Sequence, residues 1–367
     1  MTQDEINQYI AAMTTLPDIG TGRIRACMEE LNQDVEKVCW QLIKESQPYM
    51  ASEASWLPST LVGQLKRGME ACGCQVISYK DKRFPSLLQT IYQPPVCLFY
   101  IGNIDLLADD VRRIGMVGAR KCTPYGRNVA LSFSQALSQA GVVIVSGGAY
   151  GVDTYAHEGT LRGGGQTIAV MGCGLHQAYP ARNKKLFRQI VEQGGLLLSE
   201  YAPGMGVLPH NFPVRNRIIS GLSKAVVVVE ARARSGSLIT ADMAVNDGRD
   251  VFAVPGNVLA DTSAGNHWLL RQGALLATSP EDILQEYGWL GNEKSGGSSG
   301  KAVEPMVSLT TEEKKVIAEL STGEEVSLQE LVNKQVLPLA NLHVALLSLE
   351  MKKQITRTLG NGYILLR

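Results

Sequence analysis

The pattern of apolar and polar positions divides the 367 residues of the chain into regions of different periodicity. Residues 109–290 alternate short continuous apolar runs with connections long enough to hold a helix. The runs are Ile114–Val117, Val142–Val145, Thr167–Met171, Leu196–Leu198, Ala225–Val229 and Val251–Val254. Continuous β-branched runs are typical of strands that are buried on both faces. The pattern therefore predicts an α/β region built on an extended, Rossmann-like parallel sheet.

Residues 1–108 show the spacing of helices instead. Tyr9, Ile10, Met13 and Leu16 fall on one face of a helix. The glycine-containing turn at 16–22 leads into a second helical stretch, and the pair resembles a helix-hairpin-helix, as in SAM-like helical domains. The amides of such a turn can face a phosphate. The acidic charge of this region favours packing within the protein over that role.

The carboxyl-terminal part begins with a Gly/Ser-rich stretch at 291–305, which predicts a flexible linker. Residues 306–367 read as helices followed by a β-ribbon around Gly360–Gly362, an order that fits a winged-helix domain. Thr310–Glu313 has the sequence of a capping box at a helix start. The expected recognition helix, Leu339–Lys352, is only modestly basic, so we favour a protein contact over a DNA contact there.

Charge is distributed unevenly although the formal net charge is zero. Residues 1–110 carry 9 basic and 14 acidic side chains, and residues 278–367 carry 9 and 12. Residues 111–277 carry 17 basic and 9 acidic side chains, a net charge of +8. A basic body between two acidic flanks suits an anionic partner such as nucleic acid. The alternative is a set of surface arginines without a ligand.

Cysteine usage and the amino terminus bear on location. The seven cysteines include no CxxC pair, and an odd number cannot all pair, so we expect reduced thiols. The acidic start of the chain and the absence of a long apolar run predict neither a signal peptide nor a membrane span. A cytoplasmic protein without membrane contact is the resulting expectation.

Small, hydroxyl and arginine side chains gather where the predicted strands end. These positions are Gly118–Arg120, Thr123–Gly126, Ser146–Gly148, Gly172–Gly174, Arg215–Arg217, Arg234–Ser237, Thr240 and Pro255–Asn257. In doubly wound sheets, ligands bind at the carboxyl ends of the strands, where helix amino termini expose free N–H groups. Glycines permit close backbone approach, and arginines supply charge. The loops therefore predict a phosphate-binding rim.

Motifs for catalysis or cofactors are incomplete. Gly172 and Gly174 are followed by Gln177 where GxGxxG needs a third glycine, and no P-loop occurs. His157 starts an HExxH-like stretch, but Leu161 stands in place of the second histidine. Asp153 and His157 lie one helical turn apart, and we expect them to hydrogen-bond loop backbone. We therefore predict a protein that is not an enzyme and has no cofactor, catalytic residue or metal site.

The ordered motifs between Gly115 and Ala274 resemble the DprA/Smf family. They include Val117–Arg120, Val145–Ala149, Gly151–Asp153, Tyr179–Pro180, Phe212–Ile219, Ser235–Ala241 and Val254–Gly256. The resemblance implies single-stranded-DNA binding by a Rossmann-like domain, homodimerisation, and loading of RecA during natural transformation, or competence, and DNA recombination. By position, Arg120 corresponds to an arginine that grips phosphate.

A DNA-binding set follows from the rim and the resemblance together. Lys184 and Phe187 are spaced one helical turn apart, so lysine would meet phosphate while phenylalanine stacks on a base, unless Phe187 belongs to the core. The set is Gly118, Arg120, Ser146, Gly147, Lys184, Lys185, Phe187, Arg215, Asn216, Arg217, Arg234, Ser235, Gly236 and Ser237. Two alternatives stay open. One is a nucleotide-processing hydrolase of the lysine-decarboxylase-like fold, and the other is a nucleotide sensor.

Overall fold

The computed structural model describes residues 1–46, 57–290, 310–320, 326–334, 337–351, 355–357 and 362–365. The chain forms two compact units, Met1–Asn292 and Glu293–Arg367. The predicted linker at 291–305 and the predicted turn at Gly360–Asn361 lie outside the described residues. Within the described ranges, every helix is too short or too polar to cross a membrane.

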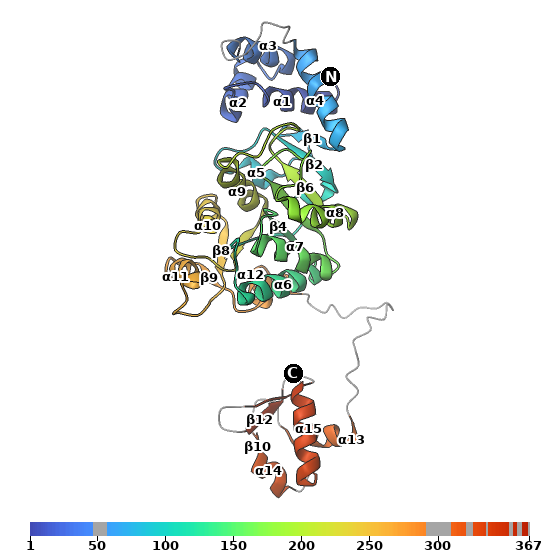
Figure 1. Cartoon of the computed structure of the whole chain (residues 1–367), viewed down its shortest axis with the longest axis vertical. Helices are drawn as coiled ribbons and strands as arrows, with labels where there is room; N and C mark the ends of the chain where they lie inside the picture. The colour runs from blue at the N-terminus through green and yellow to red at the C-terminus, as the bar shows by residue number, and fades with distance from the viewer. Residues whose placement is uncertain are drawn as a thin grey trace. The chain divides into compact units, whose positions relative to one another are not determined.

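One nine-stranded sheet organises the described part of the first unit (Figure 1). Its strands are β1 Gln75–Ser78, β2 Cys97–Gly102, β3 Arg113–Val117, β4 Val143–Ser146, β5 Thr167–Met171, β6 Leu196–Ser199, β7 Ala225–Val228, β8 Asp250–Ala253 and β9 Leu275–Leu276. Their order is β1-β2-β6-β5-β4-β3-β7-β8-β9, and neighbours from β6 through to β9 pair in parallel. Each predicted apolar run forms a strand, so the α/β class with a mostly parallel sheet is confirmed.

Helices cover both faces of this sheet. They are α5 Ser86–Gln89, α6 Pro124–Gln139, α7 Val152–Arg162, α8 Lys184–Glu192, α9 Asn211–Leu222, α10 Gly236–Asn246, α11 Ala264–Arg271 and α12 Pro280–Glu286. Ile144 packs in one core with α6, α7 and α12, whereas Val145 packs in another with α9, α10 and α11. Adjacent strand residues point to opposite faces, so a run without polar positions fills both layers.

The strand order reverses between β3 and β7. From β3 the chain adds β4, β5 and β6 on one side, and it then returns to place β7 and β8 on the other. The loops after β3 and β7 therefore run in opposite directions and leave a crevice between them. A switch of this kind is where open α/β sheets bind ligands.

Residues 75–102, expected within the helical region, contribute the two antiparallel strands β1 and β2 to the sheet edge. The preceding residues form α1 Gln3–Met13, α2 Thr21–Glu30, α3 Val35–Ser46 and α4 Pro58–Cys72. The apolar run at 96–101 is as continuous as the six runs that we read as strands. It pairs with β6 because that edge is otherwise open.

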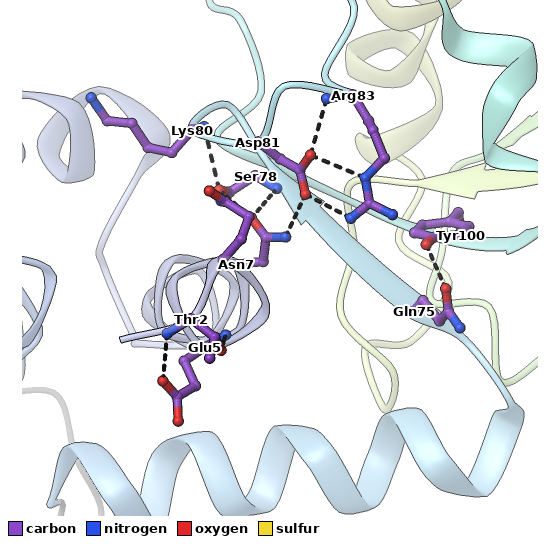
Figure 2. A network of polar contacts seen from close by, with 10 residues as sticks. Thr2, Glu5, Asn7, Gln75, Ser78, Lys80, Asp81, Arg83 and Tyr100 are labelled. Carbon is purple, nitrogen blue, oxygen red and sulfur yellow. Dashed lines mark hydrogen bonds and ion pairs between the residues drawn. The ribbon is translucent and has the colours of Figure 1, made fainter.

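A buried polar network joins α1 to β1 (Figure 2). The amide nitrogen of fully buried Asn7 donates to Asp81 over 2.8 Å, and its oxygen accepts from the backbone and hydroxyl of Ser78. Arg83 pairs with Asp81 at 2.7 Å. Hydrogen bonds from Arg83 lower the pKa of Asp81 to about 2, although burial opposes the shift. The helices thereby dock on the sheet edge through satisfied polar contacts as well as apolar packing.

The second unit has its own small core. Its elements are α13 Thr311–Glu319, β10 Val326–Ser327, α14 Leu328–Asn333, α15 Leu339–Met351, β11 Ile355–Arg357 and β12 Gly362–Leu365. The strands form an antiparallel sheet in the order β10-β12-β11. The predicted capping box is present, because Thr310 accepts from the amide of Glu313 and Glu313 accepts from that of Thr310.

Candidate nucleic-acid interface

The loops after β3, β4 and β7 enclose a hollow of about 210 Å³ at the switch in strand order, which we call the main groove. Backbone, hydroxyl and arginine groups line it together with a few apolar side chains. The lining residues are Val117, Gly118, Arg120, Ala149, Asp153, Phe212, Pro213, Arg215, Asn216, Ile219, Ser235, Gly236, Ser237, Ile239 and Thr240. Seven of the predicted site residues are thus brought together: Gly118, Arg120, Arg215, Asn216, Ser235, Gly236 and Ser237.

The amino terminus of α10 forms one wall of the main groove. Ser235 caps this helix, and its hydroxyl lies 2.7 Å from that of Ser237. The first turn contains no acidic residue, and a Cβ added to Gly236 would meet nothing within 4 Å. The amides of Ser237 and Leu238 donate to Ser235, whereas the space around Gly236 is open. Hydroxyls and open space at a helix amino terminus suit an anionic oxygen such as that of a phosphate.

Arg120 supplies an exposed cation at the end of β3. Its Cζ lies 5.8 Å from the ring centroid of Phe212, and among the described residues no carboxylate forms an ion pair with it. The backbone before it is fixed, since the amide of Ala119 donates to the carbonyl of Glu230 over 2.8 Å. A Cβ at Gly118 would lie 2.6 Å from Cγ2 of Val152, so glycine is needed there. The loop that carries Arg120 is therefore held in place, and its guanidinium interacts with the buried carboxylate of Asp153, where it opposes the rise in pKa that burial causes.

Arg215 forms the floor of the main groove. It is only 4% exposed, and its Nη1 donates to the carbonyls of Gly147 and Val170. Asp153 faces it across Gly147 and accepts from the amide of Ala149 over 3.3 Å. Burial raises the pKa of Asp153, against the opposing effects of the Arg215 cation and of the loop amides. The carboxylate of Asp153 and the guanidinium of Arg215 thus both stabilise the loop around Gly147 through contacts with its backbone.

A second, larger hollow lies beside the main groove and has a volume of about 710 Å³. We call it the basic hollow, because four cationic side chains and one acidic side chain line it. Its residues are Arg120, Lys121, Cys122, Tyr150, Gly151, Thr154, Tyr155, Glu158, Arg182, Asn183, Lys185, Leu186 and Gln189. Arg120 borders both hollows, so a ligand that leaves the main groove past Arg120 meets further positive charge.

Residues 75–288 match the family model described as DNA recombination-mediator protein A. The chain belongs to this family. The match begins at β1 and runs through α12, so it contains the nine-stranded sheet and both hollows.

Relatives of known structure support the assignment to the family. The chain is 47% identical over 210 residues to DNA processing protein DprA of Streptococcus pneumoniae. This alignment covers 57% of this chain and 73% of that protein. The X-ray structure of that species' DprA superposes with a TM-score of 0.62 at 36% identity, over 78% of this chain and 98% of that one. A Helicobacter pylori structure, described by its unique single-stranded DNA binding mode, superposes with a TM-score of 0.52 at 30% identity. That alignment covers 58% of this chain and 95% of the other.

Three predicted site residues of this family member point away from both hollows. Ser146 is fully buried and donates to the carbonyl of Met116 over 2.7 Å. Arg217 is buried in an ion pair of 2.6 Å with Glu200. It differs from Arg215 because residues two apart on a helix lie on different faces. Phe187 belongs to the core, whereas Lys184 is exposed, so the two do not face one strand as expected.

The position of Phe187 follows from its neighbour Gly148. Gly148 has a φ of +63°, and a Cβ there would lie 2.8 Å from Cε1 of Phe187. The phenyl ring thus occupies the space that a side chain at 148 would need, and it is 4% exposed. Among the other predicted residues, Gly147 covers Arg215, Lys185 lines the basic hollow, and Arg234 is exposed next to Ser235.

His157 forms a different contact from the predicted one. Thr167 gives its hydroxyl hydrogen to the carbonyl of Ile144 over 2.6 Å, so it accepts from Nδ1 of His157, 2.8 Å away. Nε2 of this fully buried ring has no partner among the described residues. Burial lowers the pKa of His157 to about 3. The side chain is therefore neutral at physiological pH and is shielded from both hollows.

Several hollow-lining residues were missed by sequence reasoning. Phe212 and Tyr179 stand in motifs that we quoted for the family, and their rings pack together with centroids 5.3 Å apart. Lys121 and Arg182 flank residues that we did select, and both line the basic hollow. Tyr150, exposed between two glycine-rich turns, was the available signal for an aromatic residue at the rim.

Proposed function

We propose that this protein binds single-stranded DNA along the main groove and the basic hollow, and loads RecA onto that strand. The observation that carries the proposal is the position of Arg120, an exposed cation shared by both hollows. A phosphate at Arg120 reaches the amides of α10 on one side and the cations of the basic hollow on the other. Phosphate contacts position a strand without reading its sequence.

The lining of the hollows favours a single strand over a duplex. Phe212 and Tyr179 present aromatic surface close to Arg120 and Arg215, which also line the small cavity between these rings. A single strand offers phosphates and unstacked base faces together, whereas a duplex keeps its base faces covered. Aromatic and cationic groups in alternation are typical of sequence-tolerant single-strand binding. The proposed contacts come from Gly118, Arg120, Lys184, Lys185, Arg215, Asn216, Arg234, Ser235, Gly236 and Ser237.

We propose binding without catalysis. Asp153 and His157 are the candidate acid and base beside the main groove. Both are buried and form hydrogen bonds within the protein. Asp153 lines the main groove, but its carboxylate accepts from the amide of Ala149 and faces the guanidinium of Arg215. His157 is enclosed in the core, so neither side chain is placed as a base beside a nucleophile, as general acid–base chemistry requires. The proposal assigns DNA binding to the first unit and a winged-helix fold to residues 306–367.

Homodimerisation is part of the proposal. Two copies of the groove on one strand raise the effective concentration of the second contact, which strengthens binding without any new contact. A bivalent clamp of this kind holds the strand against a competing binding protein while it presents DNA to a recombinase. In the cell, this activity would serve DNA recombination, including recombination during natural transformation.

The test of the proposal is RecA ATPase activity on single-stranded DNA that is already coated with single-strand-binding protein. The purified protein should shorten the lag before RecA turns over ATP, and it should hydrolyse no nucleotide by itself. The Arg120→Ala variant should lengthen the lag again in proportion to its loss of DNA affinity. An unchanged lag with a protein that still binds DNA would refute the loading role while leaving the binding role intact.

A further inference from the structure

Tyr150 stands at the boundary between two hollows of the surface. It lines the basic hollow and also a small cavity of about 40 Å³ that borders the main groove. Its side chain is 45% exposed. Among the described residues, none hydrogen-bonds its hydroxyl or stacks on its ring. A large aromatic ring is thus held at the rim with an open face.

The backbone fixes Tyr150 beside Arg120. Gly151 has a φ of +80°, and a Cβ there would lie 2.2 Å from the carbonyl oxygen of Ala119. The amide of Val152 donates to the same oxygen over 3.2 Å. The turn that carries Tyr150 is therefore pressed against the loop that carries Arg120, which explains why both residues line the same two cavities.

Positive charge continues beyond Tyr150, away from the main groove. Lys121, Arg182 and Lys185 line the basic hollow together with Arg120. The acidic residue in its lining, Glu158, lies 3.6 Å from Arg162 in an ion pair on α7. An anionic chain that passes Tyr150 thus finds cations on both sides of the ring.

Tyr150 differs from the other aromatic residues of the rim in the availability of its ring. Tyr179 is 43% exposed, but Phe212 packs against its ring at a centroid distance of 5.3 Å. Phe212 in turn lies near the guanidinium groups of Arg120 and Arg215. Tyr150 therefore offers the ring with an unoccupied face next to phosphate-binding cations.

We propose that Tyr150 stacks on a base of the bound strand and joins the main groove and the basic hollow into one continuous path. Phosphates on either side of that base would lie at Arg120 and at the Arg182 and Lys185 side of the hollow. The inference rests on the proposed binding of single-stranded DNA, and it adds a base contact that carries no sequence preference. Stacking on one aromatic side chain accounts for a loss of roughly 5- to 140-fold in affinity when alanine replaces it.

The experiment compares two ligands of equal length, oligo-dT and a deoxyribose-phosphate oligomer without bases. Affinities are measured by fluorescence anisotropy for the wild type, Tyr150→Ala and Tyr150→Phe, with thermal unfolding as a check of the fold. Tyr92→Ala serves as the matched control, because Tyr92 is a tyrosine of the same unit that is 75% exposed and lines neither hollow.

Tyr150→Ala should lose roughly 5- to 140-fold in affinity for oligo-dT and bind the oligomer without bases like the wild type. Tyr150→Phe and Tyr92→Ala should match the wild type on both ligands. Wild-type affinity of Tyr150→Ala for oligo-dT would overturn the stacking role, and so would an equal loss on both ligands. A wild type that binds neither ligand would refute the proposed function itself, and the stacking role with it.

Discussion

Nη1 of Arg215 donates a hydrogen bond of 2.8 Å to the carbonyl oxygen of Gly147. The same nitrogen also donates to the carbonyl of Val170, so one guanidinium connects the ends of β4 and β5 to α9. A Cβ at Gly147 would lie 2.6 Å from Nη2 of Arg215, which leaves only glycine at this position without a shift of the guanidinium. The floor of the main groove is thus built by a buried cation that donates to two backbone carbonyls through Nη1 and to the side chain of Asn216 through Nε.

Replacement of Arg215 should therefore reduce stability as well as DNA binding. In Arg215→Lys, a single ammonium cannot reproduce the forked contacts, and Asp153 loses its facing guanidinium. We expect the free energy of unfolding to fall by about 2–4 kcal/mol. Urea denaturation monitored by circular dichroism measures this change. Arg234→Lys, at an exposed arginine, is the control and should stay within about 0.5 kcal/mol of the wild type. Equal unfolding midpoints for both variants would contradict the role of Arg215.

Arg120→Ala should affect binding without reducing stability, because this side chain is exposed and forms no ion pair among the described residues. Affinity should fall nearly equally for all single-strand sequences, since a phosphate contact carries no base information. The slope of log K against log salt should flatten by about 0.7. Arg271→Ala, at an exposed arginine of α11 outside both hollows, is the matched control. A wild-type affinity and slope for Arg120→Ala would show that the arginine is not a phosphate contact.

His157 predicts a pH dependence of stability. Burial lowers its pKa from 6.5 to about 3, so between these values the unfolded chain binds a proton that the folded chain excludes. Stability is fully present above pH 6.5 and is lost as the pH falls, at up to about 1.4 kcal/mol per pH unit. His157→Gln should show a shallower loss between pH 6.5 and 5, a range above the titration of most carboxylates. Identical slopes for the wild type and the variant, measured by urea denaturation, would show that His157 is not the group responsible.

Deletion of residues 301–367 should leave single-strand affinity within about twofold, a change of less than 0.5 kcal/mol. Both hollows lie within the unit Met1–Asn292. The deleted residues belong to the separate second unit, which lacks the positive net charge of residues 111–277. Anisotropy titration of the truncated protein measures the affinity. Circular dichroism establishes whether it remains folded. A folded truncation that no longer binds would contradict the division of roles between the two units.

Local patterns were sufficient to predict the sheet. Each strand between Ile114 and Val254 is covered by helices on both faces of the sheet, so its residues are apolar at consecutive positions. That pattern can be recognised within a few residues of sequence. The capping box at Thr310–Glu313 was equally local. The strands at 75–78 and 97–102 were missed because we read residues 1–108 as one helical region. Their place at the sheet edge depends on pairing with β6, far along the chain.

The site was predicted as a set of loops more accurately than as a set of side chains. Glycine-rich turns at strand ends located the main groove, because parallel strands deliver their carboxyl ends to one edge. Contacts between segments that are distant in sequence determine which arginines are exposed and which are buried. Arg217 is neutralised by Glu200, and Phe187 fills the space beside Gly148. Such contacts between distant segments leave no periodic trace in the sequence, so the burial of individual side chains could not be predicted.

Binding of one labelled oligonucleotide, as a single strand and as a duplex with its complement, tests the central claim most directly. Fluorescence anisotropy titrations at several salt concentrations, without metal or nucleotide, give both affinities and their salt dependence. We predict tighter binding of the single strand at every salt concentration, because phosphate contacts at Arg120 combine with base contacts that a duplex cannot offer. Equal affinity for the two forms would contradict the account.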